Sequence, residues 1–212
     1  MQRAWAQNGA VGPGEKEMKR ISGALASLLF PVTAFAHTGV GATHGIAQGF
    51  MHPVGGADHV LAMVSVGLFA YVLGARALWL VPLAFVAMMA AGGLLGMSGF
   101  ELPFVETGIA LSIIVIGMAA ALGQKMPVTA AMALVGGFAI FHGFAHGIEM
   151  PQDASGLTYG LGFMLATALL HAAGVAACFA IASLASRYGR TAARIGGGAA
   201  ALAGMGILGG AL

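Results

Sequence analysis

The sequence predicts an all-α protein, a polytopic bundle of six transmembrane helices that follows a cleaved signal peptide. Three observations lead to this fold class. The 212 residues are 59% hydrophobic and only 8% charged, whereas soluble domains contain about 25% charged residues. The apolar residues fall into stretches close to the roughly 20 residues that cross a bilayer. The connections between these stretches are too short to hold a soluble domain.

The segment 18–36, MKRISGALASLLFPVTAFA, has the pattern of a secretory signal peptide. It combines a basic start, a short apolar centre and the small-x-small triplet Ala34-Phe35-Ala36, after which a signal peptidase cuts. An uncleaved first helix is the alternative, but the apolar centre is shorter than a span and contains Pro31. We therefore expect the mature chain to begin at His37.

The residues before the signal peptide, 1–17, show no apolar periodicity. Such a segment would be an unusual extension of a signal peptide. We interpret it as a disordered or wrongly assigned leader, with translation beginning at Met18. The transmembrane domain is then the whole mature segment, 37–212.

Each of the six apolar stretches predicts one helix. Their boundaries are 54–74, 78–97, 104–123, 127–147, 157–183 and 193–212. Proline supports several of these boundaries, since it fits the first turn of a helix and also follows helix ends. It lies in or beside predicted first turns at Pro53, Pro103 and Pro127, and it follows the fourth helix at Pro151.

The charged residues alternate between the connections and so predict the orientation of the bundle. Basic residues occupy the first, third and fifth connections: Arg76, Lys125, Arg187, Arg190 and Arg194. Acidic residues occupy or flank the others: Glu101, Glu106, Glu149 and Asp153. By the positive-inside rule, the basic connections face the cytoplasm. Signal cleavage places the new amino terminus outside, so both arguments predict a bacterial inner membrane protein whose mature termini lie in the periplasm.

Glycine is abundant, with 35 residues, and many of them lie inside the predicted helices. We interpret most as small residues that let helix backbones approach closely in lipid. Gly55-Gly56 and the glycines beside His142 and His146 have a second interpretation, local unwinding of a helix at a binding site.

Ionisable residues gather at the outer end of the predicted bundle. The segment HPVGGADH places His52, Asp58 and His59 at the outer end of the first helix, and Glu106 begins the third helix on the same side. Ionisable groups are costly inside a membrane and usually face the bundle interior or a water-filled path. Several of them at one depth therefore predict a functional site.

The fourth helix adds a polar stripe at the same end. His142, His146 and Glu149 are spaced i, i+4, i+7 and fall within roughly 60° of one another on a helix. We expect His146 and Glu149 to bind a metal with the residues of the first helix, and His142 is an additional candidate ligand.

Three other histidines lie outside this cluster. His37 and His44 are external and are candidate additional metal or entry residues. His171 lies deep in the fifth predicted helix, where a lone histidine is usually a hydrogen-bonded packing residue. We interpret it in that way.

Imidazole nitrogens and carboxylate oxygens without a thiolate favour a divalent metal such as nickel, cobalt or zinc. The single cysteine, Cys178, excludes an intramolecular disulfide and is interpreted as a small buried hydrophobic residue. The chain has neither the HExxH motif of a zinc protease nor a GxxxxGK phosphate loop. The formal net charge of +2 gives no reason to expect a nucleic-acid partner.

The segment HPVGGADHVLAMVSVGLFA, together with FHGFAHGIE in the fourth helix, resembles the signature of the HupE/UreJ family. The resemblance covers nearly the whole chain, from the signal peptide to the last helix. The polar positions that match the family are His52, Asp58, His59, Glu106, His146 and Glu149. The resemblance implies a hydrogenase or urease accessory membrane protein that acts as a nickel or cobalt permease.

We therefore expect a secondary transporter for nickel, with cobalt as a second candidate substrate, and neither catalytic activity nor a permanently bound cofactor. Its expected partners are the transported ion, the lipid bilayer and, indirectly, the machinery that matures a metalloenzyme. A homo-oligomer is compatible with the sequence. Three alternatives stay open: a haem-binding redox protein, an intramembrane metal-dependent hydrolase, and a metal sensor or chaperone that does not transport.

Overall fold

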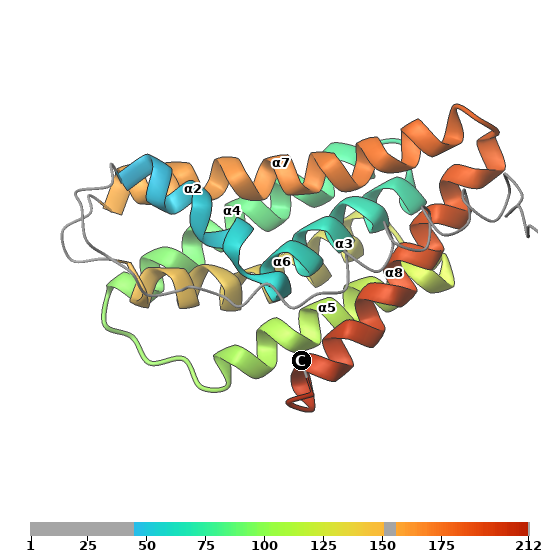
Figure 1. The fold of residues 1–212 in the computed structure, drawn as a ribbon. Coiled ribbons are helices and arrows are strands. Elements are labelled where there is room, and N and C mark those ends of the chain that lie inside the picture. Colours follow the sequence, from blue (N-terminus) through green and yellow to red (C-terminus); the bar gives the residue numbers. More distant parts are fainter. Residues whose placement is uncertain (1–44, 151–155, 212) are drawn as a thin grey trace, which may run out of the picture. The chain divides into compact units, whose positions relative to one another are not determined.

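The computed structural model describes residues 45–150 and 156–211. The predicted leader and signal peptide, together with His37, His44 and Asp153, lie outside the described residues. Within the described ranges all regular secondary structure is helical (Figure 1). The helices are α2 (Gly45–Gly55), α3 (Ala57–Leu73), α4 (Ala77–Met97), α5 (Val105–Leu122), α6 (Val128–Ile148), α7 (Gly156–Ala182) and α8 (Ser186–Leu208). The predicted all-α fold is confirmed.

Five of these helices, α4 to α8, are long and apolar enough to cross a membrane by themselves. α2 and α3 meet the same criteria only as a pair, and they are bent by 84° at the break between them. Counted as one broken span, this pair brings the number of spans in the described residues to six. The predicted multi-pass membrane bundle is therefore confirmed, with a first span that differs from the others.

The first span is not the single helix predicted over 54–74. α2 ends at Gly55, the chain breaks at Gly56, and α3 begins at Ala57. Pro53 consequently lies near the end of α2 instead of in the first turn of the span. Two adjacent glycines explain the break, because glycine has a low helix propensity and Gly56 adopts an extended backbone with φ −98° and ψ 119°.

The last helix begins earlier than the predicted boundaries 193–212. α8 starts at Ser186, so Arg187, Arg190 and Arg194 lie in its first turns and not in a connection. The reason is the composition of these turns. They contain serine and arginine, and α8 is the least apolar of the five single-helix spans. An apolar pattern alone does not detect such a polar first segment.

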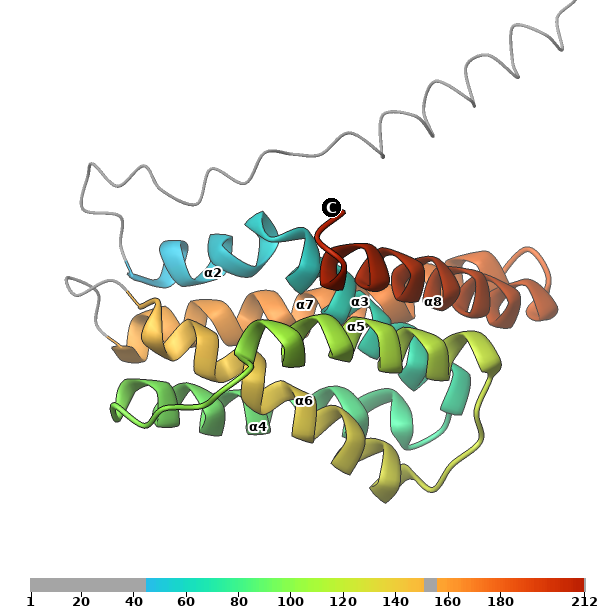
Figure 2. The same ribbon diagram turned by 90° about the horizontal axis from the view of Figure 1, so that it is seen from below.

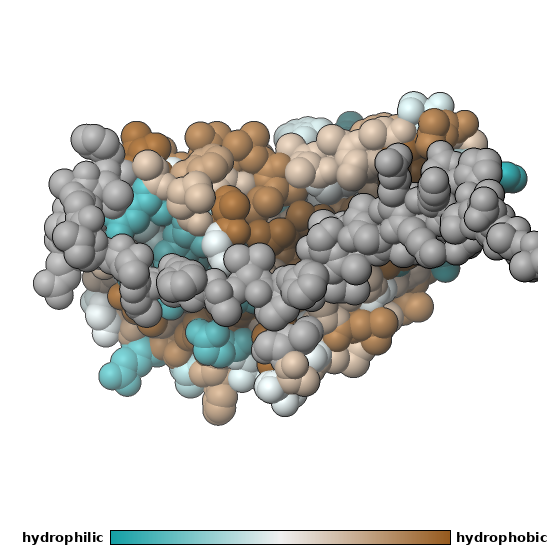
Figure 3. All heavy atoms as spheres, in the orientation of Figure 1, coloured by the Kyte–Doolittle hydropathy of each residue, from teal (hydrophilic) through white to brown (hydrophobic). Residues whose placement is uncertain are grey.

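α3 lies at the centre of the bundle. It packs against α4, α5, α7 and α8 (Figure 2), and its side chains Met63, Val66 and Phe69 are fully buried. Around it, α4 packs mainly on α6, α5 on α8 and α2 on α7. On the face shown in Figure 3, hydrophobic residues cover the middle of the bundle, and hydrophilic residues lie mostly toward one end. This distribution fits a bundle that spans a bilayer.

The basic and acidic segments lie at opposite ends of this bundle. The α3–α4, α5–α6 and α7–α8 connections share one end, and the last turns of α4 and α6 share the other (Figures 1 and 2). At the basic end, Arg194 Nε donates a hydrogen bond of 2.8 Å to the carbonyl oxygen of Ala121, near the end of α5. A cation at this position also complements the negative end of the α5 dipole.

α4 and α6 approach each other through glycines. A Cβ added at Gly92 would collide with the backbone of Ile140, and one added at Gly143 would collide with the backbone of Met89. Contact between backbones of this kind is typical of helices that associate in lipid. α6 runs without interruption from Val128 to Ile148, so the glycines beside His142 and His146 serve packing and do not unwind the helix.

We expect Gly92→Ala to destabilise the protein by about 1–3 kcal/mol, because the added methyl group overpacks the α4–α6 contact. The control is Gly137→Ala on α6, where an added Cβ meets no atom within 4 Å, so this variant should unfold like the wild type or slightly later. The measurement is unfolding of the detergent-solubilised protein by a denaturing detergent. Equal stability of Gly92→Ala and Gly137→Ala would contradict the close approach of the two backbones.

Candidate metal centre

Four histidines and two carboxylates meet where α2, α3 and the end of α6 come together. His52 belongs to α2, Asp58 and His59 to the first turn of α3, and His142, His146 and Glu149 to the last turns and the C-cap of α6. The break at Gly56 shapes this meeting point. A Cβ on Gly56 would lie 2.7 Å from Asp58 Oδ1 and 3.0 Å from His59 Nδ1. Only glycine leaves room for these side chains to fold back over the break.

α2 is held in position by close contact with α7. A Cβ added at Gly49 would collide with the backbone of Tyr159, and one added at Gly162 would collide with the backbone of Ile46. His52 thereby lies over the aromatic side chains of α7, with its ring centroid 6.1 Å from that of Tyr159.

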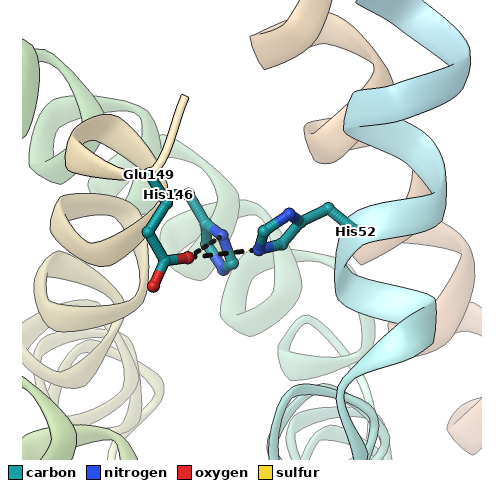
Figure 4. Close-up of side chains that lie close together, drawn as sticks. All are labelled: His52, His146 and Glu149. Carbon is teal, nitrogen blue, oxygen red and sulfur yellow. Dashed lines mark ion pairs between the residues drawn. The ribbon is translucent and has the colours of Figure 1, made fainter. Parts of the chain in front are cut away.

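The outermost group consists of His52, His146 and Glu149 (Figure 4). Each residue offers one ligand atom, and these atoms all lie within 4.8 Å of one another. His52 Nε2 lies 3.2 Å from Glu149 Oε2, and His146 Nδ1 lies 3.9 Å from the same oxygen. The three side chains point toward one another from two helices, so a divalent cation could replace the proton that His52 shares with Glu149.

The Glu149 carboxylate is suited to attract a cation. The residue follows α6, outside the membrane span, and its N–H donates to the carbonyl oxygen of Ala145 at 3.0 Å. The hydrogen bond from His52 lowers the pKa of Glu149 below its usual value, although partial burial acts in the opposite direction. A lowered pKa means that the carboxylate keeps its negative charge to a more acidic pH than a free glutamate does.

His59 lies beside His146, with ring centroids 4.5 Å apart, and its free nitrogen is defined by its neighbour Asp58. His59 Nδ1 donates a hydrogen bond of 2.8 Å to Asp58 Oδ1, which leaves Nε2 as the nitrogen with the lone pair. That Nε2 atom is buried and has no hydrogen-bond partner. A carboxylate that orients a histidine in this way is the usual second partner of a metal-binding imidazole.

His142 shows the same arrangement with a hydroxyl group. Ser112 Oγ donates to the carbonyl oxygen of Ile109 at 2.6 Å and lies 2.8 Å from His142 Nε2. Because the hydroxyl has one proton and it is used toward Ile109, His142 Nε2 must be the donor in the second contact. His142 Nδ1 then carries a lone pair, and it is buried without a partner.

The imidazole rings form a continuous series. The ring centroids of His52 and His146 are 4.7 Å apart, those of His146 and His59 are 4.5 Å apart, and those of His59 and His142 are 5.3 Å apart. The outer members are the most exposed, since the side chain of Glu149 is 47% exposed and that of His52 is 35% exposed, whereas that of His59 is 12% exposed and those of His146 and His142 are buried. The site therefore opens at the acidic end of the bundle and leads inward.

A cavity of about 380 Å³ lies beside the site, between α4, α6 and α7. Of its lining residues only His146 and Tyr159 carry polar side-chain atoms, and four are methionines. Phe163 forms part of the same wall, with its ring centroid 3.9 Å from that of His146. An apolar wall of this kind does not hydrate an ion, so it limits the polar route to the imidazole series.

The structure brings together five of the six principal predicted ligands: His52, Asp58, His59, His146 and Glu149. Glu106 is not among them. It is exposed in the first turn of α5 and makes no hydrogen bond or ion pair in the part of the chain that the structure describes. The candidate entry residues His37 and His44 lie outside the described residues.

His171 differs from its sequence interpretation as a hydrogen-bonded packing residue. It is buried, but neither ring nitrogen has a hydrogen-bond partner among residues 45–150 and 156–211. Ser112, which orients His142, was not identified from the sequence at all. The signal for it was present, because a hydroxyl inside the apolar run GIALSIIVIG is a polar group in a membrane span.

Comparison with known proteins identifies the family of the chain. The sequence model of the family described as HupE / UreJ protein matches residues 25–207. The chain is 45% identical over 190 residues to Protein HupE of Rhizobium leguminosarum bv. viciae, an alignment that covers 89% of this chain and 97% of that protein. No solved structure matches the chain. A family match over most of the chain, and a relative that is matched along nearly its whole length, show that this membrane protein belongs to the HupE/UreJ family.

Proposed function

We propose that the protein is a permease that takes up nickel, with cobalt as a second substrate, across the bacterial inner membrane. The observation that carries the proposal is the series of four imidazoles that begins at a half-exposed carboxylate and leads into the bundle. Imidazole and carboxylate ligands without thiolate suit nickel, cobalt and zinc. The resemblance to an accessory family regarded as nickel or cobalt permeases favours nickel and cobalt over zinc.

Entry begins at the acidic end of the bundle. Glu149 attracts the cation and, with His52 and His146, replaces part of its hydration shell. Glu106, which contacts none of these residues, contributes a negative charge near the same end. The ion then passes to the lone pairs of His59 and His142, which Asp58 and Ser112 orient.

Permeation requires binding that is strong enough to remove water from the ion and weak enough to release it. Neighbouring imidazoles of the series meet this requirement. At each step the ion exchanges one imidazole ligand for the next and keeps another. The protein has no phosphate loop for ATP use, so it acts as a secondary transporter. It supplies the machinery that matures a metalloenzyme, needs no resident cofactor and is not an enzyme.

We expect Glu149→Gln to reduce nickel uptake at low external metal by at least tenfold, because it keeps size and hydrogen bonding and removes the charge. His59→Ala and His146→Ala should abolish uptake. The matched control is Glu101→Gln, an exposed carboxylate at the same end of the bundle, which should transport normally. The measurement is accumulation of radioactive nickel by cells, normalised to the amount of protein in the membrane. Normal uptake by all three site variants would refute the proposal.

We expect Asp58→Asn to weaken nickel binding by about 10–100-fold, the usual cost of losing the second partner of a metal-binding imidazole. The reason is that an amide no longer selects the His59 tautomer in which Nε2 carries the lone pair. Calorimetric titration of the purified protein in detergent measures the affinity. An unchanged affinity would show that Asp58 has no role in orienting His59.

We expect Lys125 to face the cytoplasm and Glu101 the periplasm, with both mature termini in the periplasm. Cysteine introduced at each position in a Cys178→Ala background is labelled with an impermeant thiol reagent. In intact cells with a permeabilised outer membrane, the reagent should modify position 101 and leave position 125 unlabelled until the cells are lysed. The reverse pattern would invert the orientation.

A further inference from the structure

We propose that His171 is an inner metal ligand, the next position for the ion after His142 on its way toward the cytoplasm. The inference rests on the proposed transport function and extends it beyond the outer cluster. It starts from two buried nitrogens. His171 is 1% exposed, and both of its ring nitrogens lack a hydrogen-bond partner. An apolar side chain of similar size would fill this position without leaving polar atoms unsatisfied, so packing alone does not account for a histidine here.

The second step is the position of His171 relative to the outer histidines. The ring of Phe85 on α4 contacts His142 and His171. Its centroid lies 5.5 Å from that of His142 and 5.1 Å from that of His171. His142 Nδ1 is a buried lone pair without a partner. One aromatic side chain therefore contacts two imidazoles that each have an unpartnered nitrogen, and a movement of Phe85 would let an ion pass from one to the other.

The third step is depth. Tyr159, Phe163, Thr167 and His171 recur every four residues on α7, and all four are buried. Tyr159 and Phe163 contact the outer histidines, and His171 lies about 18 Å further along the helix than Tyr159 at a rise of about 1.5 Å per residue. Thr167 lies between them and donates to Met89 Sδ at 3.7 Å. This face of α7 thus continues the wall of the outer site inward and places His171 near the middle of the span.

The geometry assigns two different tasks to the two ends of the series. The outer group, with its carboxylate, captures the ion, whereas His171 is buried and its ring nitrogens have no hydrogen-bond partner among the described residues. A ligand of this kind holds an ion only transiently, because no carboxylate nearby compensates the charge of the ion. Its loss should reduce the rate of transport and leave capture unchanged.

The test compares His171→Leu and His171→Gln with the wild type in two assays. Calorimetric titration of the purified protein with nickel should give an affinity within twofold of the wild type. The initial velocity of nickel uptake into liposomes that contain the protein should fall at least tenfold, with an unchanged KM. Cys178→Ala, a buried change two turns further along α7, is the control and should transport at the wild-type rate.

Thermal unfolding in detergent separates the metal role from a structural one. Because His171→Leu removes two unsatisfied polar atoms, its unfolding midpoint should equal or exceed that of the wild type. Uptake at the wild-type velocity by either variant would overturn the inference, and so would a loss of uptake that follows a lower unfolding midpoint in both. If the wild-type protein moves no nickel into liposomes, the proposed transport function is refuted. Nickel binding in the calorimetric titration would then indicate a sensor or chaperone.

Discussion

The structure depends on one constraint, the cost of leaving a polar atom without a partner inside a membrane. An unsatisfied buried group costs about 1–3 kcal/mol, and the bilayer offers no water to reduce that cost. The backbone avoids it by forming helices throughout the described residues. The imidazoles do not avoid it. Among the described residues, nitrogens of His59, His142, His146 and His171 are buried and unpartnered, as are the hydroxyl groups of Ser65 and Tyr159. Imidazole nitrogens thus account for most of the departures from the rule.

Glycine makes the arrangement possible in two different ways. Between α4 and α6 it removes side chains, so that backbones touch and the helix carrying His142 and His146 is held firmly. At Gly56 it permits an extended backbone and an 84° bend. The bend turns one predicted span into two helices and allows His52 and His59, which lie on opposite sides of the break, to contact the same ring, that of His146. The absence of a Cβ allows the close packing on one side of the site, and at Gly56 it leaves room for the side chains of Asp58 and His59 beside the break.

The centre also illustrates how partners of a histidine determine what it can bind. Asp58 and Ser112 each occupy one nitrogen of a ring and leave the other with a lone pair that faces no protein atom able to bond it. His52 and Glu149 instead satisfy each other, at the exposed end where water can exchange with them. The outer pair is therefore satisfied without an ion, whereas in the proposed function the other imidazoles gain a partner from the transported ion. Unpartnered buried nitrogens lower the stability of the fold but leave lone pairs free for a ligand, a trade-off that is common at binding sites.

The sequence by itself determined the fold class, the number of spans and the grouping of most site residues. Apolar length specifies a membrane helix, and the spacing of His142, His146 and Glu149 places them on one face of a helix whatever packs against it. Unwinding at Gly55-Gly56 was only a second interpretation of the sequence, and the 84° bend there did not follow from it, because hydropathy does not record a change of direction. The sequence also missed the polar start of α8, because an apolar pattern does not detect helical turns that contain charged residues. Nor did it exclude Glu106 from the cluster or identify Ser112 as the partner of His142. Those assignments depend on distances between helices that are far apart in the chain. The ring contacts of Phe85 with His142 and His171 likewise form only when α4, α6 and α7 pack together.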